Sequence, residues 1–403
     1  MSLPLEGVRV LELGQIIAGT YGGQILSDMG AEVIKIESPN GDLGRNPSVA
    51  PLNQISGLFL TFNRNKKSVV IDMKTNEGRD TFLNLVKCSD IVVDNFRPGV
   101  MERLGIAYPI LTATNPRIIH CSITGFGSEG EYKNYPALDI IIQAISGHMA
   151  VTGESGRPPV RLGIPLADLS GGLFSSQGIL AALYEREKTN KGQHLELSMF
   201  DAMLSLLTYM GTMWLSDGVL PKPPGSGHEY SVPWQAFATK DSYIVVATRE
   251  ENVWERFCKS ILSEKLFLDD RFSTNALRVK NRTELIPLLE PIFLKETTEY
   301  WMDRFRINQV PAGPVNHLDQ AFAEPPAIEG NMVLECIHSQ AGVVRMPAYP
   351  VKIGDTRSKV CEPAPLLGQH TDEILSTLLS YGPSQITQLK SVGAIHDQGD
   401  KKW

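Results

Sequence analysis

The chain has 403 residues, which corresponds to two or three domains of ordinary size and allows at least one large hydrophobic core. Hydrophobic residues make up 42% and charged residues 21%, so global disorder, fibres and coiled coils are excluded. The 45 acidic and 38 basic residues give a net charge of −7, and no long Lys/Arg run occurs. This balance argues against a nucleic-acid partner.

Cysteine usage and hydropathy indicate the compartment. The five cysteines are scattered and never spaced as CxxC, which argues against a disulfide framework and favours a reducing environment. The N-terminus lacks a basic region followed by an apolar stretch, and no 18-residue uncharged apolar run follows. The eight histidines show no paired zinc spacing. We therefore expect a soluble cytoplasmic protein with no membrane partner and no metal.

In the first half, short β-rich runs alternate with segments of helical periodicity. The expected strands are 7–13, 31–37, 68–73, 91–94, 117–124 and 194–199. The expected helices are 20–29, 76–86, 98–104, 170–187 and 201–215. This alternation predicts an α/β fold with a doubly wound, Rossmann-like parallel sheet.

The second half begins with a stretch rich in Pro and Gly at 217–230, which is the predicted linker. Strands are then expected at 234–237 and 243–248, and helices near 252–261, 282–293 and 371–380. These elements indicate a smaller α+β domain after the linker.

A glycine motif after the strand at 117–124 raises the possibility of a dinucleotide site. Residues 125–130 satisfy GxGxxG, but the following EYKNYPALD has charge and proline where a helix should start. An ordinary glycine-rich loop is therefore favoured over a nicotinamide site. GxSxG is absent, which makes a serine hydrolase a minor hypothesis.

Cationic residues stand near several expected strand ends. They are the run NRNKKS at 63–68, Lys74, Arg97 and Arg103. Basic side chains beside helix starts can hold phosphates, and solvated surface charges are the equally weighted alternative.

Two carboxylates stand at the head of apolar segments. Asp168 lies in RLGIPLADLSGGLF at 161–174, beside small residues that would let a ligand approach, and Asp139 begins DIIIQAISG. An ionised aspartate can attack an activated acyl group without a separate base. Helix capping is the alternative for both residues.

Nine motifs are spread over most of the chain. They are LPLEGVRVLELG at 3–14, GAEVIKIE at 30–37, NRNKKSVVIDMK at 63–74, DNFRPGVMERLG at 94–105, PRIIHCSITGFG at 116–127, GIPLADLSGG at 163–172, GHEYSVPWQAFATKDSYIVVA at 227–247, PAGPVN at 311–316 and PLLGQHTDEIL at 365–375. Together these motifs resemble class III CoA-transferases of the CaiB/BaiF type, a family with formyl-CoA, carnitine and dicarboxylate CoA-transferases. α-Methylacyl-CoA racemases share the fold.

The resemblance implies an interlocked homodimer. Each chain would have a large CoA-binding domain of residues 1–216 and 328–403, the linker 217–230 and a small domain of residues 231–327. The active site would lie between the large domain of one subunit and the small domain of the other.

The resemblance also implies site residues. Asp168 would be the nucleophile that forms an aspartyl anhydride and then an aspartyl-CoA thioester, and Asp139 stands where formyl-CoA transferase has a glutamate. The loop with Gly225, Gly227 and His228 resembles the glycine segment that approaches the acyl site. The family's contacts with CoA, a substrate rather than a tightly bound cofactor, map onto Ile17, Ala18, Ile71, Asp72, Met73, Lys74, Asn95, Phe96, Arg97 and Arg103.

Departures from the family pattern bear on specificity. Ser38 replaces an arginine and Ile17 a glutamine of formyl-CoA transferase, which argues against formate or oxalate. The motifs resemble members that use succinyl-CoA or related dicarboxylates, with acetyl-CoA as another donor, and Arg249 could contact a distal carboxylate. Leu138 stands where racemases have a histidine, so a transferase is favoured over a racemase or a non-catalytic acyl-CoA binder.

Overall fold

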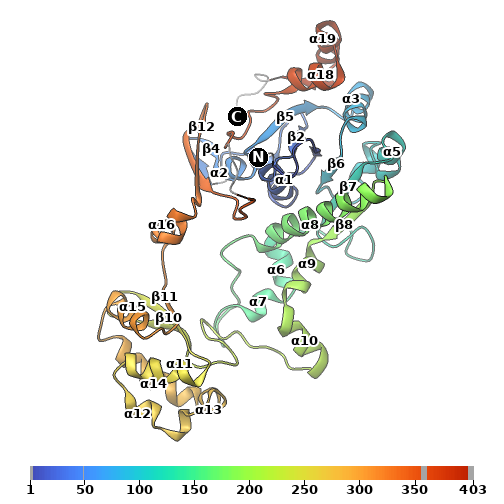
Figure 1. Ribbon diagram of the computed structural model, residues 1–403. Helices are drawn as coiled ribbons and strands as arrows, with labels where there is room; N and C mark the ends of the chain where they lie inside the picture. The colour runs from blue at the N-terminus through green and yellow to red at the C-terminus, as the bar shows by residue number, and fades with distance from the viewer. Residues whose placement is uncertain (1–2, 49, 355–360, 398–403) are drawn as a thin grey trace. The chain divides into compact units, whose positions relative to one another are not determined.

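The computed structural model describes residues 3–48, 50–354 and 361–397, which form two compact units (Figure 1). The large unit comprises 3–48, 50–148, 162–217, 326–354 and 361–397, and the small unit comprises 149–161 and 218–325. Most of the predicted linker 217–230 thus belongs to the small unit. Positions 355–360 and 398–403 of the predicted large domain lie outside the described residues.

A seven-stranded sheet in the order β14-β5-β2-β1-β6-β7-β8 is the centre of the large unit. Every neighbouring pair is parallel except β14 with β5, which is antiparallel. The strands are β1 (Arg9–Glu12), β2 (Glu32–Glu37), β5 (Lys66–Ile71), β6 (Ile91–Asp94), β7 (Ile119–Thr124), β8 (His194–Ser198) and β14 (Ile395–His396). The mixed α/β class and the mainly parallel sheet predicted from the sequence are confirmed.

The strand order reverses between β1 and β6. From β1 the chain moves outward to β2 and β5, and from β6 it moves the other way to β7 and β8. At such a switch point the loops that follow the two adjacent strands diverge, which opens a crevice at the carboxyl ends of the strands.

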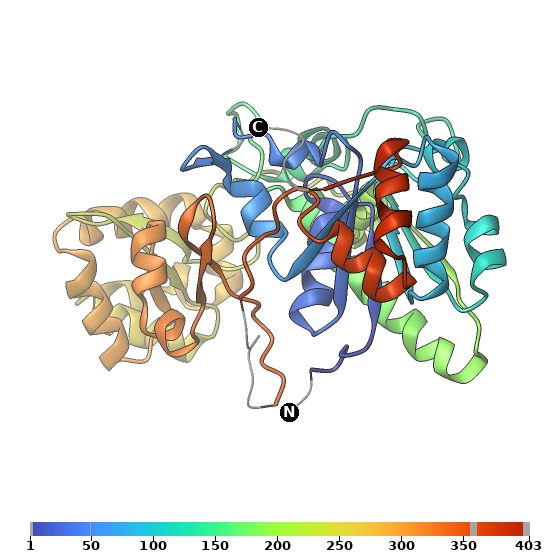
Figure 2. The same cartoon turned by 90° about the horizontal axis from the view of Figure 1, so that it is seen from above.

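Two hydrophobic cores cover the sheet because its strands carry apolar residues on both faces. Helices α1 (Ala18–Asp28) and α8 (Leu166–Thr189) pack on one face. On the other face lie α3 (Asn76–Lys87), α5 (Tyr108–Thr114) and α18 (Thr371–Leu379). Figure 2 shows the C-terminal helices α18 and α19 (Pro383–Ser391), in red, beside the blue helices of the N-terminal half. Both chain ends therefore build one fold.

Glycines allow α1 and α8 to approach closely. A Cβ atom on Gly172 would lie only 2.7 Å from the Tyr21 ring and 3.0 Å from the Gly22 nitrogen. The structure places the start of α8 at Leu166, four residues before the predicted start at 170. Asp168 is consequently the third residue of the helix, and the alternative that it caps this helix is wrong, because Pro165 occupies the cap position.

The other elements of the large unit are mostly short. They are η1 (Leu43–Arg45), β3 (Pro51–Leu52), β4 (Ile55–Ser56), α2 (Gly57–Phe62), α4 (Val100–Arg103), α6 (Asp139–Ile145), α9 (Met199–Leu206), α10 (Thr208–Asp217), β12 (Val333–His338) and β13 (Gly342–Pro347). The single helix predicted at 201–215 is thus wrong. It is two helices, because Thr208 takes a left-handed conformation with φ 48°.

The small unit has the antiparallel sheet β11-β10-β9 and an aromatic core that includes Trp254, Phe257 and Phe293. Its elements are β9 (Trp234–Ala238), β10 (Tyr243–Ala247), α11 (Glu251–Ser260), α12 (Glu264–Phe267), η2 (Asp270–Phe272), α13 (Asn275–Lys280), α14 (Arg282–Phe293), α15 (Thr298–Ile307), β11 (Ala312–Pro314) and α16 (Leu318–Ala323). Two short helices span the unit boundaries: α7 (His148–Val151) and α17 (Pro325–Glu329). In the described part of the chain, no helix has the length and apolar character needed to cross a membrane.

Candidate active site

Asp168 and Asp139 meet at the N-terminus of α8. Asp139 Oδ1 accepts hydrogen bonds from the backbone N–H groups of Ala167 (2.8 Å) and Asp168 (3.3 Å). Its Oδ2 accepts a bond from Gln143 Nε2 at 2.6 Å. Asp139 therefore caps α8 from the first turn of α6, rather than its own helix as the capping alternative assumed.

The Asp168 carboxylate is left without such partners. Among the described residues, none donates a hydrogen bond to its side chain, which is mostly buried. Burial raises the pKa of Asp168 to about 7, and the negative charge of Asp139 acts in the same direction. A carboxylate that is desolvated and only weakly stabilised is a stronger nucleophile than one held by hydrogen bonds.

The start of α1 lies beside the first turns of α8. A Cβ atom on Gly171, one turn after Asp168, would lie 3.5 Å from the Ala18 Cβ. Ile17 occupies the cap position of α1 and Ala18 is its first residue. The structure therefore brings Ala18 against the helix that carries Asp168, and Ile17 directly precedes this contact.

Three of the predicted CoA-binding cations stand at the same edge of the sheet. Lys74 follows β5, Arg97 follows β6 and Arg103 ends α4. All three side chains are exposed, and no ion pair within residues 3–48, 50–354 and 361–397 engages them. They remain available to a polyanion.

The cations of the run 63–68 are used inside the fold. Arg64 pairs with Asp28 at 2.6 Å and Lys66 with Glu12 at 2.7 Å. Lys67 lies 2.9 Å from Glu373. The hypothesis that this run binds phosphates is therefore not supported, because its charges are neutralised by neighbouring carboxylates.

The other predicted CoA contacts follow strands β5 and β6. Ile71 ends β5 and is buried, while Asp72 and Met73 form the turn toward α3. The Asn95 side chain is hydrogen-bonded to the backbone of Gln15: its Oδ1 accepts from the Gln15 N–H at 2.8 Å and its Nδ2 donates to the Gln15 carbonyl at 2.9 Å. Phe96 comes next and packs against the core of the α3 face. Asn95 thus shapes the loop after β1.

The small unit holds the predicted glycine loop. Gly225 has φ 67°, its N–H bonds the Gly153 carbonyl at 2.7 Å, and Gly227 N–H bonds the Pro224 carbonyl at 3.1 Å. The ring of His228 contacts that of Trp234, with centroids 5.1 Å apart. Residues of this loop line a cavity of about 520 Å³ together with Lys222 and Arg282. Arg249 is exposed after β10.

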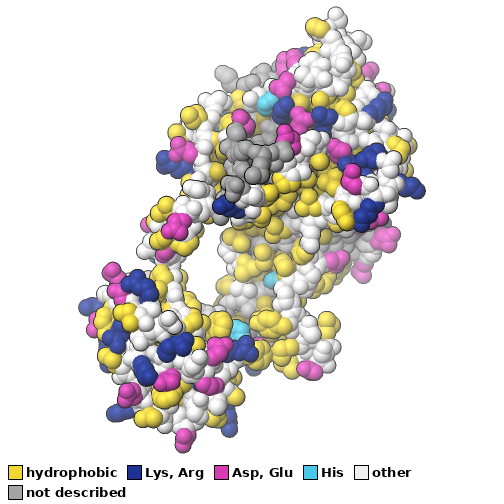
Figure 3. All heavy atoms as spheres, in the orientation of Figure 1, with side chains coloured by type: hydrophobic (Ala, Val, Ile, Leu, Met, Phe, Trp, Pro, Cys, Tyr) yellow, Lys and Arg dark blue, Asp and Glu magenta, His cyan; other side chains and the backbone are white. Residues whose placement is uncertain are grey.

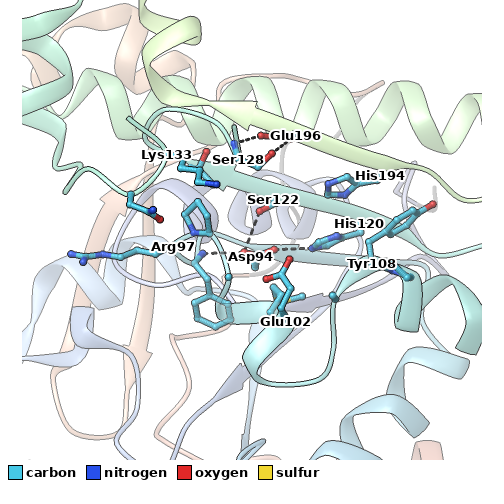
Figure 4. Close-up of a pocket in the computed structure, with 18 residues that line it drawn as sticks. Asp94, Arg97, Glu102, Tyr108, His120, Ser122, Ser128, Lys133, His194 and Glu196 are labelled. Carbon is cyan, nitrogen blue, oxygen red and sulfur yellow. Dashed lines mark hydrogen bonds and ion pairs between the residues drawn. The ribbon is translucent and has the colours of Figure 1, made fainter. Parts of the chain in front are cut away.

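A second cavity, of about 600 Å³, opens on the face of β6, β7 and β8 opposite to α8 (Figure 4). His120 Nε2 lies 2.8 Å from Asp94 Oδ2, and the rings of His120 and His194 stack at 4.8 Å. Burial, followed by the charge of His120, lowers the pKa of His194. This cluster was not among the predicted site residues, although the polar residues that alternate along 120, 122 and 124 are a signal visible in the sequence.

The glycine motif at 125–130 leads into turns, and the next helix starts only at Asp139. Ser38 is exposed after β2, and Leu138, 65% exposed, precedes Asp139. No cluster of three or more metal-ligating side chains occurs among the described residues.

The large unit is thus a mainly parallel α/β fold with a mostly buried aspartate at the start of α8 and exposed cations after β5 and β6. The CoA-transferase family III profile matches residues 5–371, and the chain belongs to this family. It is an enzyme of the CoA-transferase type.

Two relatives and one solved structure are informative. Human succinyl-CoA:glutarate CoA-transferase is 35% identical over 393 residues, 97% of this chain and 90% of that protein. Acetyl-CoA:oxalate CoA-transferase of Acetobacter aceti is 38% identical over 353 residues, 87% and 89% of the two chains. A CAIB/BAIF family protein of Brucella suis has a TM-score of 0.85 and 34% identity, covering 94% of this chain and 100% of its own.

Proposed function

We propose that the protein transfers CoA reversibly from a donor acyl-CoA, such as succinyl-CoA, to a dicarboxylic acid, with Asp168 as the nucleophile. The observation that carries this proposal is the Asp168 carboxylate at the start of α8, which is desolvated and accepts no hydrogen bond from any residue that the structure describes. Membership of the CoA-transferase family and the similarity to succinyl-CoA:glutarate CoA-transferase support the choice of substrates.

The reaction proceeds through two activated forms of the side chain. Asp168 attacks the thioester carbonyl and expels CoA thiolate, which gives a mixed anhydride of Asp168 and the donor acid. The thiolate then attacks the aspartyl carbonyl, releases the donor acid and leaves an aspartyl-CoA thioester. The acceptor carboxylate attacks this thioester and forms a second anhydride with loss of thiolate. Thiolate attack on the acceptor's acyl carbon then yields the new acyl-CoA and free Asp168.

Arg97, Arg103 and Lys74 are proposed to hold the phosphates of CoA. A chain of net charge −7 can bind this polyanion because these three exposed side chains lack competing carboxylate partners in the described structure. Ile17, Ala18, Ile71, Asp72, Met73, Asn95 and Phe96 would line the remaining contact. Gly225, Gly227 and His228, and Arg249 as a binder of the distal carboxylate, stay predictions of acceptor recognition.

The test is incubation with succinyl-CoA or acetyl-CoA and a panel of carboxylic acids, read by mass spectrometry of the CoA products. Glutarate and other dicarboxylates longer than oxalate are expected to become thioesters, whereas oxalate and formate are not. Solvent deuterium should not enter the α-carbon of a chiral acyl-CoA, since such exchange would indicate a racemase. Absence of any new thioester across the panel would refute the proposal.

The cationic edge gives a first quantitative prediction. Each of Lys74→Ala, Arg97→Ala and Arg103→Ala is expected to raise KM for acyl-CoA roughly three- to tenfold with little change in kcat, because each removes one phosphate contact. Steady-state kinetics at two salt concentrations measures this effect. Lys87→Ala, at the far end of α3, is the matched control with unchanged KM. Equal KM for the variants and wild type would contradict the assignment.

We further propose that the protein is a homodimer. In the large unit, α10 has no buried residue and exposes Tyr209, Trp214 and Leu215, and α6 exposes Ile140, Ile141 and Ile145. Figure 3 shows hydrophobic side chains gathered over α6 and α8. Such surfaces are rare on monomers and are covered in assemblies. Light scattering should give twice the 44.4 kDa chain mass, and a monomer would contradict this proposal.

A further inference from the structure

The loop between β1 and α1, residues 14–17, has an unusual backbone. Ile16 adopts φ 64°, a left-handed conformation that β-branched residues rarely take. Strain of this kind persists only where surrounding groups hold it, and it concentrates at functional sites. The loop therefore needs restraints from outside itself.

Side chains from three neighbouring segments supply these restraints. Asp42 Oδ1 accepts the Ile16 N–H at 3.0 Å. Lys35 Nζ donates to the Gly14 carbonyl at 2.7 Å. Asn95 forms the two bonds with Gln15 described above. Every residue from 14 to 16 is thus held by a side chain that belongs to another part of the sheet edge.

Asp42 and Lys35 are joined to each other in the interior. Lys35 Nζ lies 2.8 Å from Asp42 Oδ2 and 3.1 Å from Glu12 Oε1, and its side chain is fully buried. Although burial alone would lower it, the carboxylates of Asp42, Glu12 and Glu37 raise the pKa of Lys35. The lysine is therefore charged at neutral pH: it donates hydrogen bonds to Glu12 Oε1 and to the Gly14 carbonyl, and it forms an ion pair with Asp42 Oδ2.

A buried ion pair contributes little to stability compared with apolar residues of the same size, so its retention needs another explanation. Apart from the bond between Lys35 and the Glu12 carboxylate, the side-chain hydrogen bonds of this pair are made with backbone groups: Gly14 and Ile16 in the loop, and Gly44 N–H at 2.7 Å from Asp42. The loop in turn sets the start of α1, where Ala18 packs against Gly171, one turn after Asp168.

We propose that Asp42 and Lys35 are positioning residues of the acyl-CoA site, which hold the backbone of residues 14–17, with its left-handed Ile16, so that α1 begins beside the first turns of α8, the helix that carries Asp168. This inference rests on the proposed function, because the loop is assigned to acyl-CoA through Ile17 and Ala18. It concerns residues whose side chains are buried and contact no substrate themselves.

The experiment compares Asp42→Ala with Asp28→Ala. Asp28 is a matched control: it is equally buried, also pairs with a cation (Arg64, 2.6 Å), and lies at the opposite end of α1. Both variants should lower the midpoint of thermal unfolding. Only Asp42→Ala should speed hydrogen exchange of the 15–18 amides at least tenfold, raise KM for acyl-CoA about tenfold and slow adduct formation on Asp168. Asp42→Asn keeps the acceptor for Ile16 N–H, so it should restore exchange and KM to within about threefold of wild type.

Two results would overturn the inference: unchanged exchange at 15–18 in Asp42→Ala, or the same kinetic loss in Asp28→Ala. Should Asp42→Ala fail to fold, the double variant Lys35→Met/Asp42→Ala replaces it, because it leaves no unpaired lysine while still lacking the acceptor for Ile16. A wild-type protein that transfers no CoA would refute the proposed function, whereas the exchange measurement would still decide whether Asp42 holds the loop.

Discussion

Asp168→Ala is expected to reduce CoA transfer by at least about 1000-fold, because it removes the carboxyl group whose oxygen bonds the acyl group in the anhydride and whose carbon bonds the CoA sulfur in the thioester. Acyl-CoA should still bind, since the cations at the sheet edge and the loop after β1 are unchanged. The measurement combines initial rates from product mass spectrometry with equilibrium binding of acyl-CoA.

Trapping experiments decide whether the loss reflects a missing nucleophile. With donor acyl-CoA present, hydroxylamine or borohydride should modify wild-type Asp168, and peptide mapping should locate the change. Asp168→Asn is the isosteric control, because it keeps the volume and the backbone bond to Asp139. Transfer at the wild-type rate in either variant would show that Asp168 is not the nucleophile.

Asp139→Ala is expected to lower kcat about 30- to 100-fold and to shift the acidic limb of the pH profile to lower pH. The wild-type limb should lie near pH 7, where Asp168 becomes ionised. Removing the Asp139 charge lowers the pKa of Asp168, and the freed N–H groups of Ala167 and Asp168 stabilise the Asp168 carboxylate further. More of the carboxylate is then ionised at low pH, but it is less basic and less firmly oriented.

Asp139→Asn separates charge from capping. Its amide oxygen can still accept from Ala167, so we expect the pH shift to remain while most of kcat returns.

The pH dependence of the unfolding free energy tests the raised pKa of Asp168 independently of catalysis. Because the pKa of Asp168 is raised on folding, the folded state binds more protons than the unfolded state between about pH 4 and 7. The contribution of Asp168 to the unfolding free energy therefore falls as the pH rises through that window. Asp168→Asn should remove this fall, and an unaltered pH dependence of stability would contradict the raised pKa.

The parallel sheet was predictable because its strands are short β-rich runs separated by helices, and this pattern is local in the sequence. β14 was not, since two residues at 395–396 carry no periodicity and pair only through contact with β5. The break between α9 and α10 was also missed, because the left-handed Thr208 interrupts an otherwise continuous apolar pattern.

For the site, Asp168 could be singled out because it is the lone charge in an apolar stretch. The contact of Asp139 with the start of α8 could not be predicted, because a hydrogen bond between residues 28 positions apart depends on where α6 meets α8. The run at 63–68 shows that a motif can also predict a binding site that the fold does not support. Its charges looked like a phosphate site, but Asp28, Glu12 and Glu373 reach them only in the folded chain.

The pairing of β14 with β5 bears on how the chain can be synthesised. The large unit takes strands from residues 9–12 and from 395–396, so its sheet reaches full width only after residue 396 has left the ribosome. Most of the small unit, 218–325, is contiguous and can fold while synthesis continues. Until β14 forms, β5 presents an unpaired edge, which makes the unfinished chain prone to pairing with other molecules. By pairing with β5, β14 covers this edge.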